Sequence, residues 1–387
     1  MSPKRPTLLI LVAISTLQPI ALNMVAPATP ALARAFSASY ATIQLTLTLF
    51  LVAVAATQLV VGPLSDRFGR RPCVLAGIVA FIAGSALGAL AETTEALLFS
   101  RVLEGAGAGT TFALARAIIR DTSSRDEAAG QIASVTMVMV VAPMLAPYVG
   151  GHIETWFGWR MIFWTMTAAG VAVLALTTLR LPETAPDVGV STSLLGVFRA
   201  FPALAADRSF IIDVVALAMT SASFFAFIAA APFIVVETMG RGSDVYGAYF
   251  ILNALGYMIG NFAMSRLAIR VGTARMVRIG LAISFVALSA AFAISLSAHW
   301  TPLTLFLPLA LNAIGNGLTI PGATASALSA RPELAGSAAG LMGAVQLGSG
   351  ALATIVISAA VIVWPQALMA MMWLMLAVAL LALRFGR

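Results

Sequence analysis

The segment Gly62-Pro63-Leu64-Ser65-Asp66-Arg67-Phe68-Gly69-Arg70-Arg71-Pro72 carries one acid and three arginines between two apolar runs, 41–61 and 73–91. Each run is about long enough to cross a bilayer as a helix, which takes roughly 20 apolar residues. The charged segment between the runs therefore lies at a membrane surface. Its excess of arginine indicates the cytoplasmic surface, by the positive-inside rule. The pattern predicts a helical hairpin in a membrane, with a short charged turn.

The composition of the whole chain is that of a membrane protein. Of its 387 residues 60% are hydrophobic and only 10% are charged, whereas a soluble domain carries about 25% charged residues. The net charge is +7, and the basic residues lie in short loops between apolar runs. Membrane topology therefore explains the positive charge better than nucleic-acid binding does. The single cysteine, Cys73, excludes a disulfide within the chain. The sequence has no phosphate-binding loop, metal-ligand cluster or nucleophile elbow, so we expect no cofactor, no metal site and no enzymatic activity.

The apolar runs predict twelve membrane-spanning helices in two sets of six. The chain then divides into an N-terminal half (1–180), a cytoplasmic linker (181–208) and a C-terminal half (209–387). The spans are expected at about 7–27, 41–61, 73–91, 97–119, 132–153, 160–180, 209–231, 245–268, 275–296, 302–322, 334–358 and 363–383. Seventeen of the 22 basic residues fall on one side of this topology, three on the other and two inside the fourth run, which predicts cytoplasmic termini. The first run is longer than the core of a secretory signal, so we expect an uncleaved helix there.

The charged turn resembles the loop between the second and third helices of major facilitator superfamily transporters, whose pattern is G-x-L-[ST]-D-R-x-G-R-[RK]-P. The resemblance implies an all-helical membrane protein of twelve helices, with two pseudo-symmetric six-helix halves around a central cavity. It also implies a conformational latch on the cytoplasmic face, formed by Gly62, Asp66, Arg67, Gly69, Arg70, Arg71 and Asp121. In that latch, which would hold the cytoplasmic face closed in the outward-open state, we expect Arg67 to pair with Asp121. We expect Asp66 to accept from the start of the eleventh helix, near Glu333.

Further stretches resemble the bicyclomycin/chloramphenicol-resistance branch (Bcr/CflA) of that family. They are Asn23-Met24-Val25-Ala26-Pro27-Ala28-Thr29-Pro30-Ala31-Leu32, Gln44-Leu45-Thr46, 116–121 and 158–160. The fifth span, at 142–151, resembles the antiporter motif G-P-x-x-G-P-x-x-G-G of exporting members, with alanine in place of two glycines. Its prolines kink the helix and its glycines allow tight packing, which implies a hinge built from Pro143, Pro147, Gly150 and Gly151.

The fourth span carries charges that cost roughly 2.5–3.5 kcal/mol each on insertion scales. Arg101 and Glu104 are three residues apart and share one helix face. The stretch 99–109 resembles a second family motif, R-x-x-Q-G-x-G, with Glu104 in place of the glutamine. Two interpretations stay open. The pair is either a structural ion pair that locks the N-terminal half, or a proton-coupling site in which burial favours protonated Glu104 and Arg101 opposes it.

One departure from the branch bears on proton coupling. In the Bcr/CflA branch an aspartate opens the signature, whereas this chain has Asn23, which cannot titrate. Either Glu104 has taken over the proton role, or coupling is different, or the protein is not driven by protons. The exchange of Asp for Asn and of Gln for Glu on neighbouring helices would leave one acid near Arg101. This favours the alternative in which Glu104 has taken over the proton role.

Uncharged polar side chains in the central spans are candidate substrate contacts, because polar residues in membrane helices usually face the protein interior. For each of them a helix-packing role is an equal alternative. The candidates are Gln18, Asn23, Asn253, Tyr257, Asn312, Asn316 and Gln346. Asp213, about one turn into the seventh span, is expected at the cytoplasmic interface.

These features predict a secondary active transporter, a monomer in the bacterial inner membrane that exports small amphipathic compounds in exchange for protons. Two alternatives remain: an importer of a siderophore or metabolite on the same fold, and a non-transporting membrane sensor. The antiporter-like prolines argue against the importer, whereas Asn23 argues mildly for it. The sequence does not identify the substrate, because pockets of this family differ by a few side chains.

Overall fold

The protein is a bundle of helices in its computed structural model, which describes residues 6–122, 145–185, 201–297, 300–331 and 334–386. No strand occurs in these residues. The first part of the chain forms α1 (Leu8–Val25), η1 (Ala26–Ala28), α2 (Thr29–Ala35), α3 (Tyr40–Phe68), α4 (Arg70–Ala89), α5 (Thr94–Thr122), a helix at 145–157, and α7 (Trp159–Arg180). The second part forms α9 (Phe201–Ala205), α10 (Arg208–Phe233), the π-helical η2 (Ile234–Thr238), α11 (Ser243–Val271), α12 (Thr273–Ser295), α13 (Pro302–Ala330), α14 (Ala335–Val363) and α15 (Ala367–Gly386).

The predicted membrane fold is confirmed. Within the described residues, ten helical segments are long and apolar enough to cross a bilayer. The eighth span is α11, which has 29 residues and the length to cross, although it is more polar than those ten. The fifth span is the helix at 145–157, and the start predicted for it lies outside the described residues. Together these segments are the twelve helices expected from the sequence.

The first span is longer than predicted. Its expected end near residue 27 is wrong, because helical structure continues through η1 and α2 to Ala35. Pro27 and Pro30 each stand in the first two positions of a helical segment, where the missing N–H group of proline costs little. The extension carries Arg34 into the last turn of α2.

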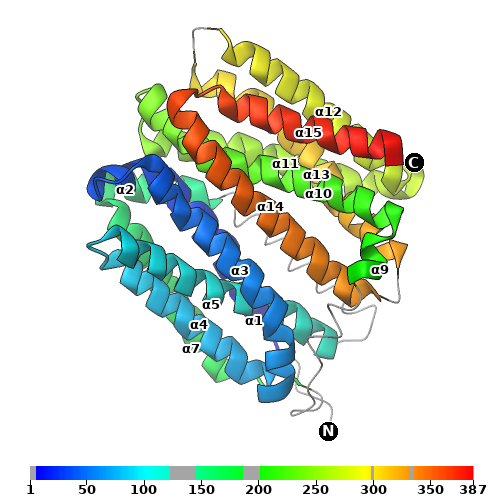
Figure 1. The fold of residues 1–387 in the computed structure, drawn as a ribbon. Helices are drawn as coiled ribbons and strands as arrows, with labels where there is room; N and C mark the ends of the chain where they lie inside the picture. Colours follow the sequence, from blue (N-terminus) through cyan, green and yellow to red (C-terminus); the bar gives the residue numbers. More distant parts are fainter. Residues whose placement is uncertain (1–5, 123–144, 186–200, 298–299, 332–333, 387) are drawn as a thin grey trace.

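The helices pack in two groups that follow the order of the chain (Figure 1). In the first group α5 packs against α1, α3 and α4, and α4 also packs against α7. In the second group α13 packs against α11 and α12, and α10 packs against α14 and α15. Glycines bring α4 and α5 close together: a Cβ atom on Gly84 would lie 2.8 Å from the Cα atom of Glu104. The small residues around Glu104 therefore allow the close helix approach that the sequence predicts.

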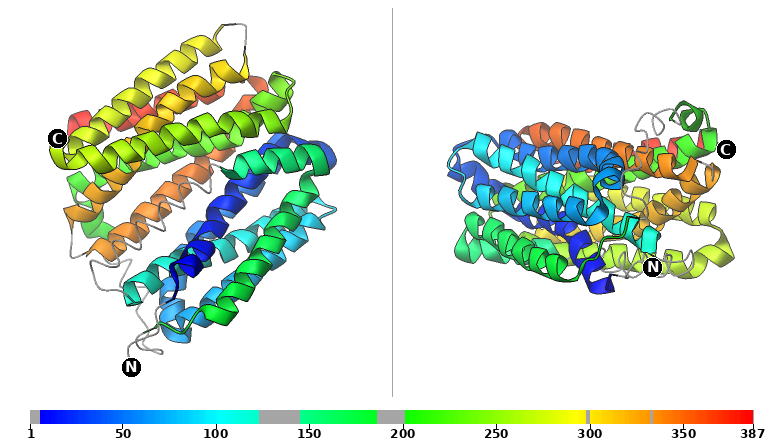
Figure 2. Two further views of the ribbon diagram at one scale, coloured as in Figure 1. Left: turned by 180° about the vertical axis from the view of Figure 1, so that it is seen from behind. Right: turned by 90° about the horizontal axis from the view of Figure 1, so that it is seen from below.

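The two groups touch along α3 and α14, and their ribbons converge at one end of the molecule (Figure 2). We call this the Arg34 end, because an ion pair joins Arg34 of α2 to Glu237 of η2 there. The opposite end, where α3 turns into α4, is called the Arg70 end. Toward the Arg70 end the ribbons of the two groups diverge (Figures 1 and 2).

Candidate functional site

Arg101 and Glu104 form an ion pair that is sealed inside the first helix group. Both side chains are 0% exposed, and Arg101 Nη1 donates to Glu104 Oε2. The second carboxylate oxygen, Oε1, accepts from the hydroxyl of Ser85 on α4 at 3.0 Å. The pair that the spacing predicts is therefore present, with its negative charge held between α4 and α5.

The Arg101 guanidinium has further partners on two other helices. Nη2 donates to the carbonyl of Ala21 on α1 at 3.2 Å, and Nε donates to the carbonyl of Thr46 on α3 at 3.4 Å. Its central carbon lies 4.4 Å from the ring centroid of Phe50, also on α3. Arg101 thus ties α1 and α3 to α5 through acceptors other than Glu104.

Four of the predicted substrate contacts carry an amide oxygen that has no donor among the described residues. These residues are buried on α1, α11 and α13: Gln18, Asn23, Asn253 and Asn312. The orientation of the Asn23 amide is fixed, because its Nδ2 donates to the carbonyl of Pro19 at 2.8 Å. Its Oδ1 is therefore the atom without a donor among the described residues. Burying a polar atom without a partner costs about 1–3 kcal/mol. Each of these oxygens is also closed to solvent in this conformation, so a donor on a ligand would meet it only after the helices move.

Two of the other predicted substrate contacts bond to side chains inside the second helix group. Asn316 Oδ1 lies 3.5 Å from the donating hydroxyl of Ser284 on α12. Gln346 Nε2 donates to the hydroxyl of Ser221 on α10 at 2.9 Å. Tyr257 is half-buried on α11. The bonds of Asn316 and Gln346 match the helix-packing alternative that the sequence left open.

The charged turn at the Arg70 end is organised around Arg70. Its guanidinium bonds to Asp121 at 2.8 Å and to Asp66 at 2.7 Å, and the Arg70 side chain is only 5% exposed. Arg67 is exposed, with its guanidinium carbon 5.2 Å from the ring centroid of Phe68. In this structure Asp121 pairs with Arg70. The pair expected between Arg67 and Asp121 in the outward-open state stays a prediction. The expected partner of Asp66 near residue 333 lies outside the described residues.

Glu183 completes this turn, and no pattern in the sequence indicates its role. Its carboxylate accepts from the backbone N–H groups of Arg70 at 2.8 Å and Arg71 at 3.1 Å, and so caps the start of α4. Two amides of its own loop also donate to it, at 2.9 and 3.0 Å. Partial burial acts to raise the pKa of Glu183, but these four amides together lower it below its ordinary value. Gly69 is required here, with φ of +97° and a Cβ position only 2.6 Å from Glu183 Oε2.

The predicted hinge residues within the described part lie where the fifth span meets other helices. A Cβ atom on Gly150 would lie 3.0 Å from the carbonyl carbon of Met24 on α1, and one on Gly151 would lie 3.0 Å from that of Ser243 on α11. Glycine at both positions lets the fifth span contact each helix group. Pro147 lies against Gly247 of α11, whereas Pro143 is outside the described residues.

The comparison with known proteins agrees with this architecture. The family model described as Major Facilitator Superfamily matches residues 11–354. The chain belongs to the Major Facilitator Superfamily. The structure of this transporter resembles a bacterial homologue of the human lysosomal transporter Spinster, with a TM-score of 0.73 at 18% identity over 97% of this chain and 96% of the other. It also resembles the human organic anion transporter MFSD10, with a TM-score of 0.72 at 18% identity over 98% of each chain.

Curated relatives of this transporter include drug-resistance proteins. A bicyclomycin resistance protein homolog of Haemophilus influenzae is 30% identical over 88% of this chain and 85% of that protein. The MFS-type transporter YdgK of Bacillus subtilis is 29% identical over 88% of this chain and 85% of that protein. The multidrug resistance protein MdtL of Escherichia coli is 31% identical over 62% of this chain and 61% of that protein. The resemblance of the sequence motifs to this family and to its drug-resistance members is thereby confirmed.

At the Arg34 end a hydrogen-bonded clamp joins the two halves of the transporter. The Tyr40 hydroxyl and Gln44 Nε2, both on α3, donate to the carbonyl of Ala229 on α10, at 2.7 and 2.8 Å. α10 is irregular just beyond this point, with Pro232 inside it and the π-helical η2 following. The sequence gives no signal for this clamp, because its acceptor is a backbone carbonyl that any residue supplies.

Asp213 is buried inside the second helix group. It is 1% exposed, and the hydroxyl of Ser326 on α13 donates to it. Leu204 of α9 and Phe210 of α10 are buried together in one apolar cluster. The short helix α9 packs against α10 and α14. The position expected for Asp213 at the cytoplasmic interface stays a prediction.

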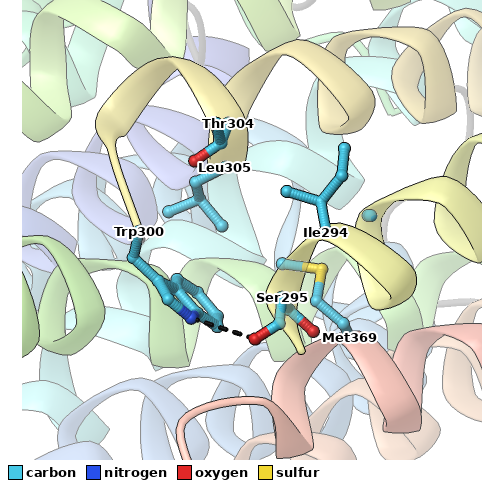
Figure 3. Close-up of a pocket in the computed structure, with 7 residues that line it drawn as sticks. Ile294, Ser295, Trp300, Thr304, Leu305 and Met369 are labelled. Atoms are coloured by element: carbon cyan, nitrogen blue, oxygen red, sulfur yellow. Dashed lines mark hydrogen bonds between the residues drawn. The ribbon is translucent and has the colours of Figure 1, made fainter. Parts of the chain in front are cut away.

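A small cavity lies apart from all the candidate residues (Figure 3). It encloses about 10 Å³ between α12, α13 and α15, beside Trp300, whose Nε1 donates to the carbonyl of Ser295 at 3.2 Å. Such a volume holds about one water molecule, so this cavity is too small for a substrate. Within the described part of the chain no three His, Cys, Asp or Glu residues gather as a metal site would need.

Proposed function

We propose that this transporter exports small amphipathic compounds by proton antiport across a bacterial inner membrane. The observation that carries the proposal is the 30% identity to the bicyclomycin resistance protein homolog over 88% of the chain. The similarity of this chain to the multidrug resistance protein MdtL also supports export. The excess of arginine in the turn at 62–72 supports a cytoplasmic Arg70 end with both termini on that side. One chain holds both helix groups, which supports a monomer as the working unit.

The substrate site we propose is built from Gln18, Asn23, Asn253 and Asn312. Their oxygens are acceptors, so they favour compounds with hydroxyl, amide or amine donors. None of the four carries a charge, and apolar side chains dominate the helices around them. A small compound with a few donors on an apolar body suits these surroundings. The engaged side chains Asn316 and Gln346 would then shape the site indirectly, through helix packing, whereas the half-buried Tyr257 stays a candidate contact.

We assign proton coupling to Glu104 and Arg101. A proton on Glu104 cancels one charge of the pair, and Arg101 then depends more on its acceptors Ala21 on α1 and Thr46 on α3. Protonation therefore changes the forces between α5 and these two helices. A change of this kind couples transport to protons if the two states of the transporter respond to it differently. Because the pair is sealed in this conformation, the proton would enter when the Arg34 end is open.

The contacts between halves support an inward-open conformation for this structure. The clamp at Ala229, the Arg34–Glu237 ion pair and the bond between Thr48 and Thr354 all lie in the half of the molecule nearer the Arg34 end. In this state Arg70 binds Asp66 and Asp121, which belong to its own helix group. We propose that the latch residues at 62–71 and Asp121 exchange partners when the Arg70 end closes, with Pro143, Pro147, Gly150 and Gly151 as the hinge.

The direction of transport is tested by accumulation in cells. The protein would be expressed in bacteria that lack their main efflux pumps, and the uptake of bicyclomycin, a phenicol and a lipophilic cation would be measured. We expect lower accumulation with the wild type and with the control Glu95→Gln, whose exposed side chain lies in the first turn of α5. Glu104→Gln should abolish the difference. Higher accumulation would instead indicate an importer, and unchanged accumulation of every compound would favour the sensor.

A further inference from the structure

The turn from α11 into α12 gathers four arginines at the Arg70 end. α11 follows η2, which lies at the Arg34 end, so α11 ends at the Arg70 end. Gly272, with φ of +89°, reverses the chain there. All four side chains are exposed and lie within six residues of Gly272; we call them the arginine patch: Arg266 and Arg270 on α11, and Arg275 and Arg278 on α12. The members of each pair are three or four residues apart, so each pair shares one helix face.

The arginine patch has no acids of its own. The sequence contains no Asp or Glu between Asp244 and Glu333. Among the described residues, the ion pairs of the molecule involve none of the four guanidinium groups. The matching turn from α3 into α4 differs, because Arg70 there pairs with Asp66 and Asp121. The charges of the arginine patch are therefore available to an anion from outside the chain.

The faces that carry the arginines also carry exposed apolar side chains. Phe262 is 62% exposed one turn before Arg266, whose guanidinium carbon lies 5.4 Å from the ring centroid of Phe262. Ile259 is exposed one turn further along α11, and Val286 is 68% exposed on α12. α11 and α12 pack against α13 through other faces and lie at the surface of the second helix group (Figure 2). In a bilayer these apolar faces meet lipid chains.

The arginine patch lies at the depth of the lipid head groups. At ~1.5 Å per residue, its outermost members are about 9 Å from Gly272 along the helix axes. The polar region on each side of a bilayer is about 5–7 Å thick, and an arginine side chain extends its guanidinium toward the water. An anion at this depth that also covers Ile259 and Phe262 needs a charged head and an apolar chain. A soluble anion would leave both side chains bare.

We propose that the arginine patch binds an anionic phospholipid from the leaflet at the Arg70 end. The phosphate accepts from the guanidinium N–H groups, whose planar fork matches phosphate oxygens. An acyl chain lies along Ile259 and Phe262. A head group with an ammonium would place a positive charge beside arginines that no acid compensates, so a head group of net negative charge is favoured. The bound lipid holds the end of the α11–α12 hairpin in that leaflet. This site needs neither the proposed substrate nor the proposed direction of transport.

Lipid titration tests the site without a transport assay. Phosphatidylglycerol or phosphatidylcholine would be added to the purified protein in detergent micelles, and bound lipid counted by native mass spectrometry. We expect phosphatidylglycerol to bind the wild type more tightly than phosphatidylcholine. An arginine near an anionic lipid contributes about fivefold in affinity, so Arg266→Gln with Arg270→Gln should weaken phosphatidylglycerol binding about 30-fold. The matched control is Arg67→Gln with Arg180→Gln, which removes two exposed arginines of the first helix group at the same end and should leave the binding unchanged.

A phosphatidylglycerol with a diazirine in one acyl chain locates the site. We expect label on the peptides that cover 255–286, removed by excess phosphatidylglycerol and kept in excess inorganic phosphate. Competition by inorganic phosphate would indicate a site for free anions and overturn the lipid assignment. Equal affinity for the two lipids in the wild type, or an equal loss in the control variant, would reduce the effect to the general attraction of a positive surface and also overturn it. If the first double variant does not fold, Arg275→Gln with Arg278→Gln tests the other pair, with the same loss expected.

Discussion

Removing the donors of Tyr40 and Gln44 should open the Arg34 end. Tyr40→Phe and Gln44→Leu together delete both side-chain hydrogen bonds to the carbonyl of Ala229, at 2.7 and 2.8 Å. A hydrogen bond contributes about 1 kcal/mol net, so the pair stabilises the closed Arg34 end by about 2 kcal/mol. At 1.4 kcal/mol per factor of ten this is an increase of about 30-fold in the ratio of open to closed. A state populated at about 1% would rise to about 20%.

The measurement is the distance between spin labels on the two halves at this end. Ala35→Cys and Thr238→Cys, both at exposed positions, would be labelled in a Cys73→Ser background and examined by double electron–electron resonance. The double variant should add a long-distance population that the parent lacks. Tyr246→Phe is the matched control, since its buried hydroxyl has no partner among the described residues and its loss breaks no bond. Unchanged distances in the double variant would refute the clamp.

Three further predictions concern stability. Gly84→Leu should lower the free energy of unfolding in micelles by about 1–3 kcal/mol, because its Cβ would meet the Glu104 backbone, whereas Gly340→Leu meets open space and should not. Arg101→Leu leaves a buried carboxylate and should cost about 3–5 kcal/mol, most of which Arg101→Leu with Glu104→Leu recovers. The lowered pKa of Glu183 means that its capping bonds stabilise the fold above the ordinary value of 4.5 and are lost as pH falls through the folded-state pKa. In the wild type, hydrogen-exchange protection of the first amides of α4 should decrease as the pH drops through that folded-state pKa, which lies below 4.5. In Glu183→Gln it should not.

The sequence was most informative where the bilayer restricts what a chain can do. Charged residues in an apolar run are costly, so Arg101 and Glu104 at a spacing of three had to pair, and they do. The turn at 62–72 had to lie at the end of two helices for the same reason. These inferences need only the helical period and the cost of charge in lipid, and they hold without knowledge of the tertiary contacts.

The sequence was less informative about which neighbour a side chain meets. Arg67 and Arg70 both follow Asp66, but Arg70 is buried and takes the partner expected for Arg67. The choice depends on where α3 ends, and Gly69 sets that end with its positive φ. Likewise nothing in the spacing of Asn312 and Asn316, one turn apart, shows that Asn316 contacts Ser284 while the oxygen of Asn312 keeps no donor among the described residues. Such differences come from helix rotation, which tertiary packing decides.

Proton movement in proteoliposomes tests the central claim most directly. Purified wild type, Glu104→Gln and Glu95→Gln would be reconstituted with a trapped pH-sensitive dye, and bicyclomycin, a phenicol and a lipophilic cation added in turn under an imposed pH gradient. We predict proton movement that depends on added compound in the wild type and in Glu95→Gln, and none in Glu104→Gln. Movement that persists in Glu104→Gln, or its absence with every compound in the wild type, would contradict antiport through Glu104.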